Sequence, residues 1–335
     1  MKRSLSWIIK AAVGGVIALI LLCLLCLIYC NTPVHYASET GVTEYYWEPN
    51  RFYCSATEGF GWGRTNNEGF NNLADYHSGD SVDILMMGSS QMDGRTIPQK
   101  DNAVVLLNGM FGGEKYTYNI GMSGHTLLYC IKHLSPALER YQPKGYVVIE
   151  TCLVDFSASD MQAVLDGTLP DIPSHSGGIV GVMQKLPYLR LFYQKYINGM
   201  NNGDDVEQSS AEAAAAAPAE YTELLNRLME KVSEECRTAE VKPIIIFDSS
   251  VSVDRDGNGY VPVNTEKLTI LKEACEENNI CFVDLSDRFL DGYEQYRKLP
   301  TGFANTAPGS GHMNSWGHEL FAQGVYDAIA EREVR

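Results

Sequence analysis

Five short apolar runs recur along the chain from residue 82 onward. They are VDILMMG (82–88), YTYNIG (116–121), GYVVIET (145–151), KPIIIFDSS (242–250) and ICFVDLS (280–286). Each run is nearly continuous in apolar residues instead of alternating with polar ones, which is typical of a strand buried on both faces. The runs therefore predict the strands of a parallel five-stranded sheet that is covered by helices on each side.

Apolar residues between these runs recur at the spacing of helix faces. The stripes are Leu127, Ile131, Leu134 and Leu138, then Leu268, Leu271 and Cys275, and finally Leu320, Phe321, Val325 and Ile329. Strands that alternate with helices predict right-handed crossovers and a three-layer α/β/α sandwich. In such sheets ligands bind beyond the carboxyl ends of the strands, so we expect the functional residues there.

The N-terminus carries an uncharged apolar stretch of 20 residues at 11–30. At ~1.5 Å per helical residue it can cross the ~30 Å hydrocarbon core of a bilayer. Lys2, Arg3 and Lys10 precede it and predict a cytoplasmic N-terminus with the remainder outside. A cleaved signal peptide is the alternative, but the run is longer than a usual signal core and no small-x-small site follows. We expect one transmembrane helix that anchors the chain in the cell membrane as a single-pass protein.

The remaining chain divides by composition. Residues 1–10 form the cytoplasmic basic N-terminus and 31–80 a tether with a small β-rich appendage, whose aromatic and glycine-rich sequence predicts short strands and tight turns. Its aromatic residues have two interpretations, a buried layer, which we favour, or a sugar-stacking platform. Residues 81–335 form the α/β domain, with a flexible insertion of low complexity around 200–220. The helix expected after it carries one apolar face made of Leu224, Leu225, Leu228, Met229 and Val232.

Charge and cysteine usage narrow the function classes. With 26 basic and 42 acidic residues the formal net charge is −16, which argues against a nucleic-acid partner. Of nine cysteines, three lie in the apolar N-terminal stretch. The other six fall mostly within predicted strands and helices at no metal-ligand spacing, so we expect buried free thiols, with a disulfide as the alternative in an oxidising exterior.

One motif resembles the start of a calcium-binding loop. DRDGNGY (254–260) places Asp254, Asp256 and Asn258 at alternate positions, as oxygen ligands would be. The twelfth position is Thr265, however, and Glu266 falls one residue late. A polar loop after the fourth strand is the favoured interpretation, and the sequence predicts neither a metal site nor a cofactor.

Three polar stretches follow strand ends and carry candidate chemistry. In GSS (88–90), Gly88 permits a sharp turn and the next helix aims its N–H groups at a serine, which suits a nucleophile. In YNIGMSGHT (118–126), a glycine with a free N–H just before a helix can donate to an oxyanion. In GSGHMNSWGHELFA (309–322), a histidine on a loop tethered by a helix suits a general base.

Together these stretches resemble the conserved blocks of the SGNH (GDSL-like) hydrolase superfamily. The blocks are Gly88-Ser89-Ser90, the stretch from Gly121 to Gly124, and His312-Met313-Asn314 followed by Gly317-His318. Their order and spacing match over roughly residues 82–332, and the chain looks most like the membrane-anchored extracytoplasmic branch, in which serine replaces the aspartate of the GDS motif. The resemblance implies the flavodoxin-like fold of that superfamily and an enzyme that modifies envelope polymers. Several members of that branch partner a membrane-bound O-acyltransferase and transfer acyl groups, often acetyl.

The resemblance also implies a role for each matched residue. Ser90 matches the nucleophile, and its N–H is one oxyanion donor. Gly124 matches the second donor, and His312 matches the base that takes the proton of the Ser90 hydroxyl. Further pocket candidates are Ser89, His125 and Asn314.

Two other histidines have alternative interpretations. His318 competes with His312 for the role of the base, but in the family pattern it more often packs or caps a helix. For His125, we favour a solvent-exposed position at a helix start over one that lines the pocket.

The sequence departs from the family pattern at the third oxyanion donor. Members usually present an asparagine at the end of the third strand, where this chain reads IETCLVDF (149–156) and has Val154 at the nearest equivalent position. The hydroxyl of Thr151 could donate instead, or the oxyanion hole has only two donors. We keep both possibilities open.

A second departure concerns the group that orients the histidine. The usual aspartate before the histidine is missing, because that motif reads Gly309-Ser310-Gly311-His312. We therefore expect a Ser–His dyad in which a backbone carbonyl or another acid orients the imidazole. Asp284 and Asp287 lie near a strand end, but nothing in the sequence selects either.

These observations lead to two hypotheses of different classes. The first is an O-acetyltransferase or acetylesterase that acts on a cell-envelope or secreted polysaccharide through an acyl-enzyme on Ser90. The resemblance implies a membrane-bound O-acyltransferase as one route by which the acyl donor arrives. The second is a catalytically inactive carbohydrate-binding or scaffold module of an envelope assembly complex.

Overall fold

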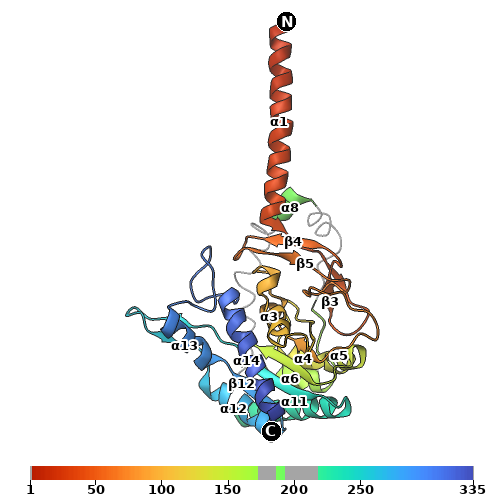
Figure 1. Cartoon of the computed structure of the whole chain (residues 1–335), viewed down its shortest axis with the longest axis vertical. Coiled ribbons are helices and arrows are strands. Elements are labelled where there is room, and N and C mark those ends of the chain that lie inside the picture. Colours follow the sequence, from red (N-terminus) through yellow and green to blue (C-terminus); the bar gives the residue numbers. More distant parts are fainter. Residues whose placement is uncertain (1, 173–185, 193–217, 335) are drawn as a thin grey trace.

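The structure, a computed structural model, describes residues 2–172, 186–192 and 218–334. Figure 1 shows a domain of helices packed around a sheet, with one long helix, α1, rising from it. The insertion expected around 200–220 lies outside the described residues except for its last three positions.

All five apolar runs form strands of one parallel sheet, as predicted. The strands are β6 (Ile84–Met87), β7 (Thr117–Asn119), β8 (Tyr146–Thr151), β9 (Lys242–Phe247) and β12 (Cys281–Asp284). Their order in the sheet is β12-β9-β8-β6-β7, and every neighbouring pair is parallel. The chain therefore builds outward from β6 to β7 and then crosses to β8 on the other side. This reversal puts the switch point of the sheet at the carboxyl end of β6, the position at which ligands bind in open α/β sheets.

Helices cover both faces of the sheet, which confirms the three-layer α/β/α sandwich. One face carries α3 (Ala103–Met110), α13 (Ser286–Tyr296) and α14 (Ser315–Val334). The other carries α4 (Leu127–Lys132), α5 (Leu134–Tyr141), α6 (Ala158–Leu165), α11 (Pro218–Thr238) and α12 (Thr265–Glu277). Because side chains alternate along a strand, Ile84 and Met86 of β6 pack on the first layer and Leu85 and Met87 on the second.

The predicted helical stripes are buried against the sheet. The stripe that begins at Leu127 belongs to two helices instead of one, because α4 ends before His133 and α5 follows directly. Short elements complete the domain: α2 (Ser90–Asp93), the 3-10 turn Gln99–Asp101, and the hairpin β10 (Ser252–Val253) and β11 (Gly259–Tyr260). That hairpin contains the DRDGNGY motif, and Asp254 there accepts the N–H groups of Asp256 and Asn258 at 2.8 and 2.9 Å. Its carboxylate thus closes the turn of the predicted polar loop.

Short strands precede the sandwich, as the sequence predicts. They are β1 (Cys30–Asn31), β2 (His35–Ala37), β3 (Tyr45–Trp47), β4 (Phe52–Ser55) and β5 (Gly61–Arg64), and we call them the β layer. β1, β4 and β5 form one antiparallel sheet, and β2 pairs with β3. Tyr45 and Trp47 are buried in the same core cluster as the α4–α5 side of the sandwich. These two aromatic residues thus form part of the core, as the favoured interpretation expects.

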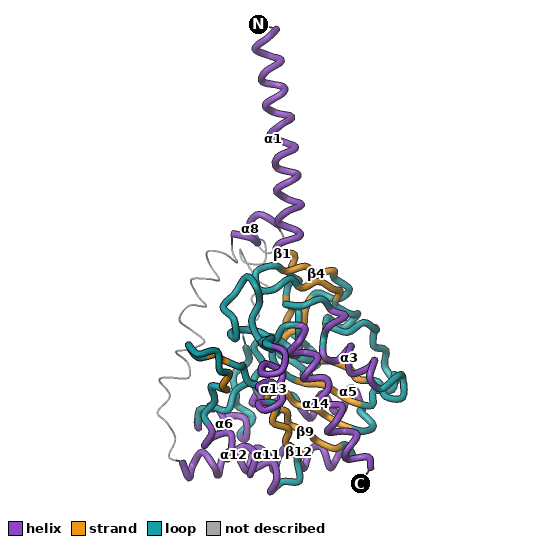
Figure 2. Tube along the Cα trace, turned by 60° about the vertical axis from the view of Figure 1, so that its left-hand side comes forward, coloured by secondary structure: helices purple, strands orange, loops and turns teal. Residues whose placement is uncertain are grey.

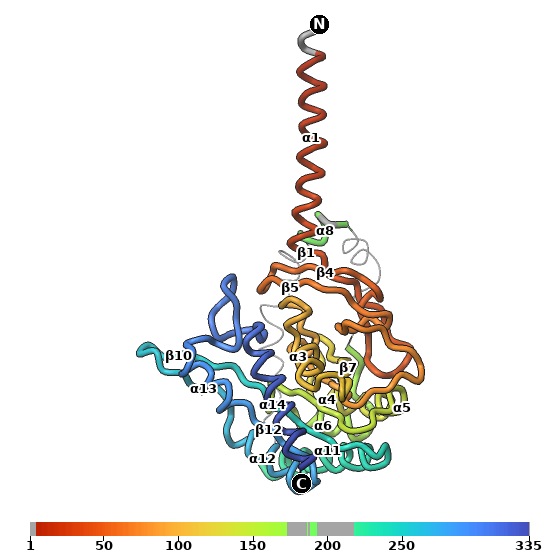
Figure 3. Tube along the Cα trace, viewed as in Figure 1, coloured from red at the N-terminus to blue at the C-terminus, as the bar shows by residue number. Residues whose placement is uncertain are grey.

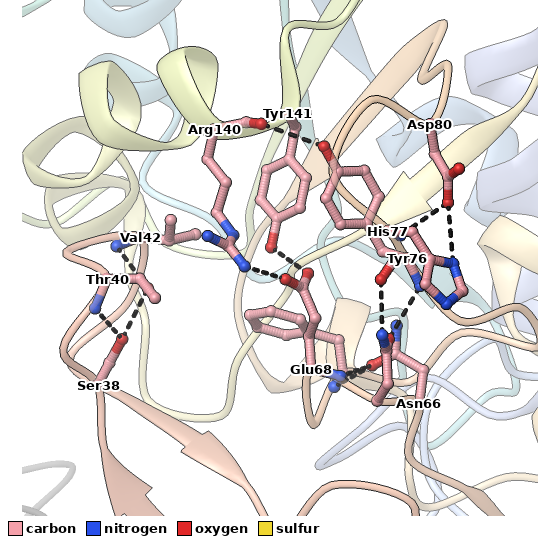
Figure 4. A network of polar contacts seen from close by, with 12 residues as sticks. Ser38, Thr40, Val42, Asn66, Glu68, Tyr76, His77, Asp80, Arg140 and Tyr141 are labelled. Carbon is pink, nitrogen blue, oxygen red and sulfur yellow. Dashed lines mark hydrogen bonds and ion pairs between the residues drawn. The ribbon is translucent and has the colours of Figure 1, made fainter.

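A polar network fixes the segment after β5 to helix α5 (Figure 4). The carboxylate of Glu68 accepts hydrogen bonds from Arg140 and, at 2.8 Å, from the hydroxyl of Tyr141. The Tyr76 hydroxyl donates to the carbonyl oxygen of Arg140 at 3.1 Å. A cavity of about 600 Å³ lies beside these residues, and Glu68, Tyr76, Arg140 and Tyr141 form part of its lining.

Helix α1 (Lys2–Tyr29) starts earlier than the predicted span and includes the basic N-terminal residues. Its segment Leu5–Tyr29 is long and apolar enough to cross a membrane. The short helix α8 (Pro187–Phe192) lies beside the last turns of α1, and β4 lies just below them, in both Figure 1 and Figure 2. No disulfide joins any of the nine cysteines, all of which lie in the part of the chain that the structure describes.

Candidate active site

The turn after β6 places two serines at the sheet's crevice. Ser89 caps α2, because its Oγ accepts the N–H of Gln91 at 3.1 Å. Ser89 is also fixed to Glu150 of β8: its N–H donates to Oε2 at 2.6 Å and its hydroxyl to Oε1 at 3.1 Å. A β-carbon at Gly88 would collide with the Glu150 carboxylate, so the turn requires glycine. Ser89 therefore holds the turn, and Ser90 is the first residue of the helix beyond it.

A buried pair of acids supports this turn from below. Glu150 lies in β8, and Asp248 directly follows the neighbouring strand β9. Both side chains are almost fully buried. Burial raises the pKa of Asp248 well above its ordinary value, and the neighbouring Glu150 charge raises it further. Burial also raises the pKa of Glu150, against hydrogen bonds from Asp248 and Ser89 that lower it. Burial thus disfavours a charge on either acid, and Glu150 accepts the hydrogen bonds of Ser89.

His312 is oriented by an acid from the β layer. Its Nδ1 lies 2.6 Å from Oε2 of Glu58, and its backbone N–H donates to Oε1 of the same carboxylate at 2.8 Å. Glu58 lies in the turn between β4 and β5, 254 positions earlier in the chain. A β-carbon at Gly311 would collide with the Glu58 carboxylate, so glycine is needed beside the histidine. The orienting acid of the predicted dyad is thus Glu58.

The contacts with His312 favour the charged form of the Glu58 carboxyl group. Burial alone would raise the pKa of Glu58, but the hydrogen bonds and charge of His312 outweigh it and hold the pKa below the ordinary value. A carboxylate on Nδ1 fixes the ring tautomer and stabilises the imidazolium that forms when Nε2 takes a proton. The His312 side chain is 30% exposed, so the ring is accessible from the crevice.

Gln91 brings Ser90 next to His312. Its Oε1 accepts the N–H of Met313 at 2.7 Å, and its Nε2 reaches the carbonyl oxygen of Gly311 at 3.5 Å. The side chain directly after Ser90 therefore binds the backbone on both sides of His312. The turn that carries Ser90 and the loop that carries His312 are thus linked independently of Glu58.

A second link holds the Glu58 turn to the loop that carries His312. Asn305 donates to the carbonyl oxygens of Ala56 and Gly59 at 3.1 and 3.2 Å, and its Oδ1 accepts the N–H of Gly59 at 2.8 Å. Figure 3 shows the two segments, from opposite ends of the chain, side by side on the upper part of the domain. The position of Glu58 is thus set by the backbone around it and not by the histidine alone.

The predicted oxyanion loop also lies against the serine turn. The N–H of Met122 donates to the carbonyl oxygen of Gly88 at 2.9 Å, and the hydroxyl of Ser123 donates to Asp93 of α2 at 2.7 Å. Gly124 is exposed and has a φ of +86°, which favours glycine. Within the described residues no hydrogen bond occupies the N–H of Ser90 or that of Gly124. Both N–H groups are thus available to an incoming oxyanion.

Two further candidates are bonded to the chain itself. The hydroxyl of Thr151 donates to the carbonyl oxygen of Leu153 at 2.8 Å, so this bond would have to break before Thr151 could serve an oxyanion. Its role as a donor stays a prediction. Asn314 donates to the carbonyls of Leu299 and Gly302 at 2.7 and 3.0 Å and accepts N–H groups at the start of α14. It also lines a cavity of about 400 Å³, but its amide acts as a cap.

The other candidates for the base and for its orienting acid are His318, Asp284 and Asp287. His318 is buried, and its Nδ1 accepts the N–H of Ala103 at the start of α3, which confirms the capping interpretation. Burial lowers the pKa of His318 to about 3, so it stays neutral. Asp284 accepts the N–H of Ser286 at 2.8 Å, and Asp287 lies in the first turn of α13.

The expectation that His125 is solvent-exposed is wrong. Its side chain is 4% exposed, and its Nε2 lies 2.8 Å from Oε2 of Glu44, just before β3. Glu44 also pairs with His133 at 2.6 Å and with Lys132 at 3.1 Å. The histidine turns inward because the β layer supplies a buried carboxylate for it, which a local helix pattern does not reveal.

Glu58 is the functional residue that sequence reasoning missed. The only local signal is an acid between glycine-rich strand patterns in SATEGFGWG (55–63). Nothing in that stretch points to a histidine near the other end of the chain. The partner becomes visible only when the β layer is folded onto the sandwich.

No model of a protein family and no curated protein matches this sequence. Among solved structures, the chain is similar to a psychrotrophic esterase from Pseudoalteromonas sp. (14% identity, 76% of this chain and 100% of the other, TM-score 0.41). It is also similar to a lipase/acylhydrolase from Enterococcus faecalis (16%, 75% and 96%, TM-score 0.42). A third is a putative SGNH hydrolase from Slackia heliotrinireducens (13%, 75% and 100%, TM-score 0.39). The roles of individual residues follow from the geometry of this chain alone.

Proposed function

We propose that this chain is a serine esterase or acyltransferase that works through an acyl-enzyme on Ser90. The observation that carries the proposal is the Glu58–His312 pair, whose loop is bound by Gln91, the residue directly after Ser90. An acid that orients a histidine, which in turn activates a serine, is the arrangement of a serine triad. Glu58 occupies the place of the acid that the sequence motif lacks.

The first half-reaction transfers an acyl group to the enzyme. Nε2 of His312 takes the proton of the Ser90 hydroxyl while Oγ attacks the carbonyl carbon of an ester donor. The N–H groups of Ser90 and Gly124 donate to the oxygen that becomes negative, and Glu58 stabilises the imidazolium. When the tetrahedral intermediate collapses, the bond to the leaving alkoxide breaks and His312 returns the proton to it. The product alcohol leaves, and the acyl group stays as an ester on Ser90.

The second half-reaction releases the acyl group. His312 takes a proton from the hydroxyl of an acceptor, whose oxygen attacks the acyl carbon on Ser90. Collapse of the second tetrahedral intermediate breaks the bond to Oγ, and His312 gives its proton back to Ser90. If the acceptor is water the reaction is hydrolysis, and if it is a sugar hydroxyl the reaction is acyl transfer. Both outcomes use the same residues.

The proposed setting is the outer side of the cell membrane. Helix α1 carries a segment of suitable length and composition for an anchor, and the basic residues before it favour a cytoplasmic N-terminus. We propose a polysaccharide of the cell envelope, or a secreted one, as the acceptor or substrate, and acetyl as the acyl group. An acyl donor could reach Ser90 through a membrane-bound O-acyltransferase.

A catalytically inactive binding module is the competing proposal. Its main support is the missing aspartate in the histidine motif. Glu58 weakens that support because it makes the same contact with Nδ1 from another part of the chain. We therefore favour the enzyme.

A fluorophosphonate probe tests the proposal on the full-length protein in detergent. The probe should phosphonylate Ser90 with loss of fluoride and add one adduct per chain, seen by intact mass and mapped to Ser90 by peptide mass spectrometry. Ser90→Ala should abolish the adduct and the hydrolysis of aryl acetates. Ser159→Ala, at an exposed serine on α6, is the matched control and should react like the wild type.

The opposite result is equally clear. A folded protein that takes up no probe and does not hydrolyse an aryl acetate would favour the inactive binding module. Acetyl analysis of envelope glycans from cells that carry wild type or Ser90→Ala then tests the proposed polymer.

A further inference from the structure

A group of large apolar side chains is exposed at the end of the domain from which α1 rises. On the hairpin formed by β4 and β5, Phe52 is 55% exposed, Phe60 52% and Trp62 43%. On and beside α8, Leu186 is 49% exposed, Leu189 39% and Phe192 50%. An exposed apolar patch of this kind marks a site of contact with another protein or with a membrane. We call these six side chains the interfacial face.

The hairpin has two different sides. Phe52 lies opposite Arg64 and Cys54 opposite Trp62 in the β4–β5 register, so Phe52, Trp62 and Arg64 share one face. On the other face a β-carbon at Gly61 would collide with the carbonyl of Arg95, which shows how closely that side packs on the sandwich. Aromatic side chains with an exposed Arg64 are thus directed away from the domain.

The hairpin is joined directly to the end of α1. The carbonyl oxygen of Tyr29, the last residue of the helix, accepts the N–H of Ala56 at 2.8 Å. Cys30 and Asn31 then pair with β4 as strand β1. Figures 1 and 2 both show β4 immediately below the end of the helix. If α1 crosses a bilayer, the next layer of protein is this hairpin.

Helix α8 packs along the last turns of α1, above the hairpin. Its Tyr188 hydroxyl donates to the carbonyl oxygen of Leu19 in α1. Arg190 is buried and donates to the Asn31 side chain of β1 at 3.1 Å. Leu186, Leu189 and Phe192 are left exposed next to the apolar helix. The apolar surface of α1 thus continues onto α8.

We propose that the interfacial face rests in the headgroup region of the bilayer that α1 crosses. The inference depends on α1 as the anchor of the proposed function. Aromatic side chains favour the membrane–water interface, and apolar residues beside arginine are typical of segments that lie on it. The partner is therefore a phospholipid surface, fixed by the continuity of this face with the helix.

The face has a consequence for the active site. The turn that joins its two strands carries Glu58, the acid that orients His312. The catalytic acid and the membrane contact therefore belong to one hairpin. Ser90 is connected to this hairpin through Gln91, the loop of His312 and Glu58.

Tryptophan quenching by brominated lipid tests the proposal. The full-length protein is reconstituted into phosphatidylcholine vesicles with or without lipid brominated near the top of its acyl chains. The chain has four tryptophans, of which Trp7 lies in α1, so the Trp7→Phe variant removes the signal of the helix. We expect bromolipid to quench this variant still. Adding Trp62→Phe should remove most of that quenching, whereas adding Trp316→Phe, in the sandwich, should leave it.

The possible results separate the inference from the proposed function. The interfacial face is contradicted if bromolipid does not quench the Trp7→Phe variant. It is also contradicted if bromolipid still quenches that variant after Trp62 is replaced as well. If even wild-type Trp7 escapes quenching, α1 is not in the bilayer, and the anchor fails together with the inference. Probe labelling of Ser90 in the same vesicles reports the chemistry separately, so an active enzyme with unquenched Trp62 would overturn only the membrane contact.

Discussion

Two glutamates of the β layer each reach across to a histidine of the sandwich, with different surroundings. Glu58 meets His312 at the crevice, where the two side chains are 23% and 30% exposed. Glu44 meets His125 in the interior, where the side chains are 1% and 4% exposed. Both contacts are short, at 2.6 and 2.8 Å. The same chemical pair therefore occurs once at a reactive serine and once in a packed interior.

The neighbours of each pair explain the difference. His312 bonds its acid through Nδ1, and Gln91, the residue after Ser90, binds the loop that carries it. Glu44 is surrounded by His125, His133 and Lys132, and its carboxylate joins the β layer to α4 and α5. Burial tends to raise the pKa of Glu44, but hydrogen bonds from the two histidines hold it well below the ordinary value. Exposure and a link to the serine turn, and not the acid–histidine contact itself, distinguish the pair that we propose to be catalytic from the buried pair.

Glu58→Gln should produce the largest effect on activity. The amide keeps the size of the side chain but cannot stabilise an imidazolium, so we expect kcat for aryl-acetate hydrolysis to fall by about 10²- to 10⁴-fold. The melting temperature should change little, because the pair is partly exposed and Asn305 holds the turn separately. Glu58→Asp should restore part of the rate. An unchanged kcat in the amide variant would remove Glu58 from the mechanism.

Glu44→Gln should produce the opposite pattern. Loss of a buried charge that faces two histidines and a lysine should destabilise the fold by about 2–4 kcal/mol. This corresponds to a drop of roughly 5–10 °C in melting temperature for a domain of this size. The kcat per folded molecule should stay within a few-fold of wild type. A stable variant with a large loss of kcat would show that the buried pair also serves the chemistry.

Gly311→Ala tests the approach of Glu58 from the other side of the contact. The new methyl group would collide with the Glu58 carboxylate, and a φ of +87° is unfavourable for alanine. We expect a loss of about tenfold or more in kcat, since a misplaced orienting group costs up to ~100-fold. Gly257→Ala, at a φ of +86° in the distant β10–β11 hairpin, is the matched control for backbone strain. Equal losses of kcat in both variants would argue against a specific clash.

Lowering the pH should distinguish the Glu58–His312 pair from the Glu44–His125 pair, because the two pairs lose their contribution to stability over different ranges of pH. A carboxyl with a lowered pKa stabilises the fold above its unfolded value, about 4.3, and this contribution is lost as pH falls through the folded value. The pKa of both glutamates is lowered in the structure, and that of Glu44 is lowered further. Melting temperatures of wild type and the two amide variants, measured from pH 7 to 3, should converge for Glu58 first. Convergence in the reverse order would contradict the assigned surroundings.

The smallest effect concerns the third oxyanion donor. Thr151→Val removes a hydroxyl that donates to Leu153 and that the proposed mechanism leaves unused. We expect kcat to change by less than about threefold. A loss of ~100-fold, as for removal of an oxyanion donor, would show that Thr151 turns toward the substrate.

The sequence predicts the sandwich well because its signals are local. Each buried parallel strand is an apolar run, and each helix is an apolar stripe, so β6 to β12 and α14 follow from short windows. The serine, glycine and histidine stretches also lie at strand ends, and the switch between β6 and β8 brings them to one edge. The register of the β layer on the sandwich has no such signal. Glu58 and Glu44 are therefore recognised only in the folded chain.

The most direct test compares the rate at which a fluorophosphonate labels Ser90 in three full-length proteins at neutral pH. These are wild type, Glu58→Gln and Glu44→Gln, assayed well below their melting temperatures. If Glu58 orients the catalytic histidine, labelling slows by about 100-fold or more in the first variant and by only a few-fold in the second. Equal rates in wild type and Glu58→Gln, or equal slowing in both variants, would contradict the Ser90–His312–Glu58 triad.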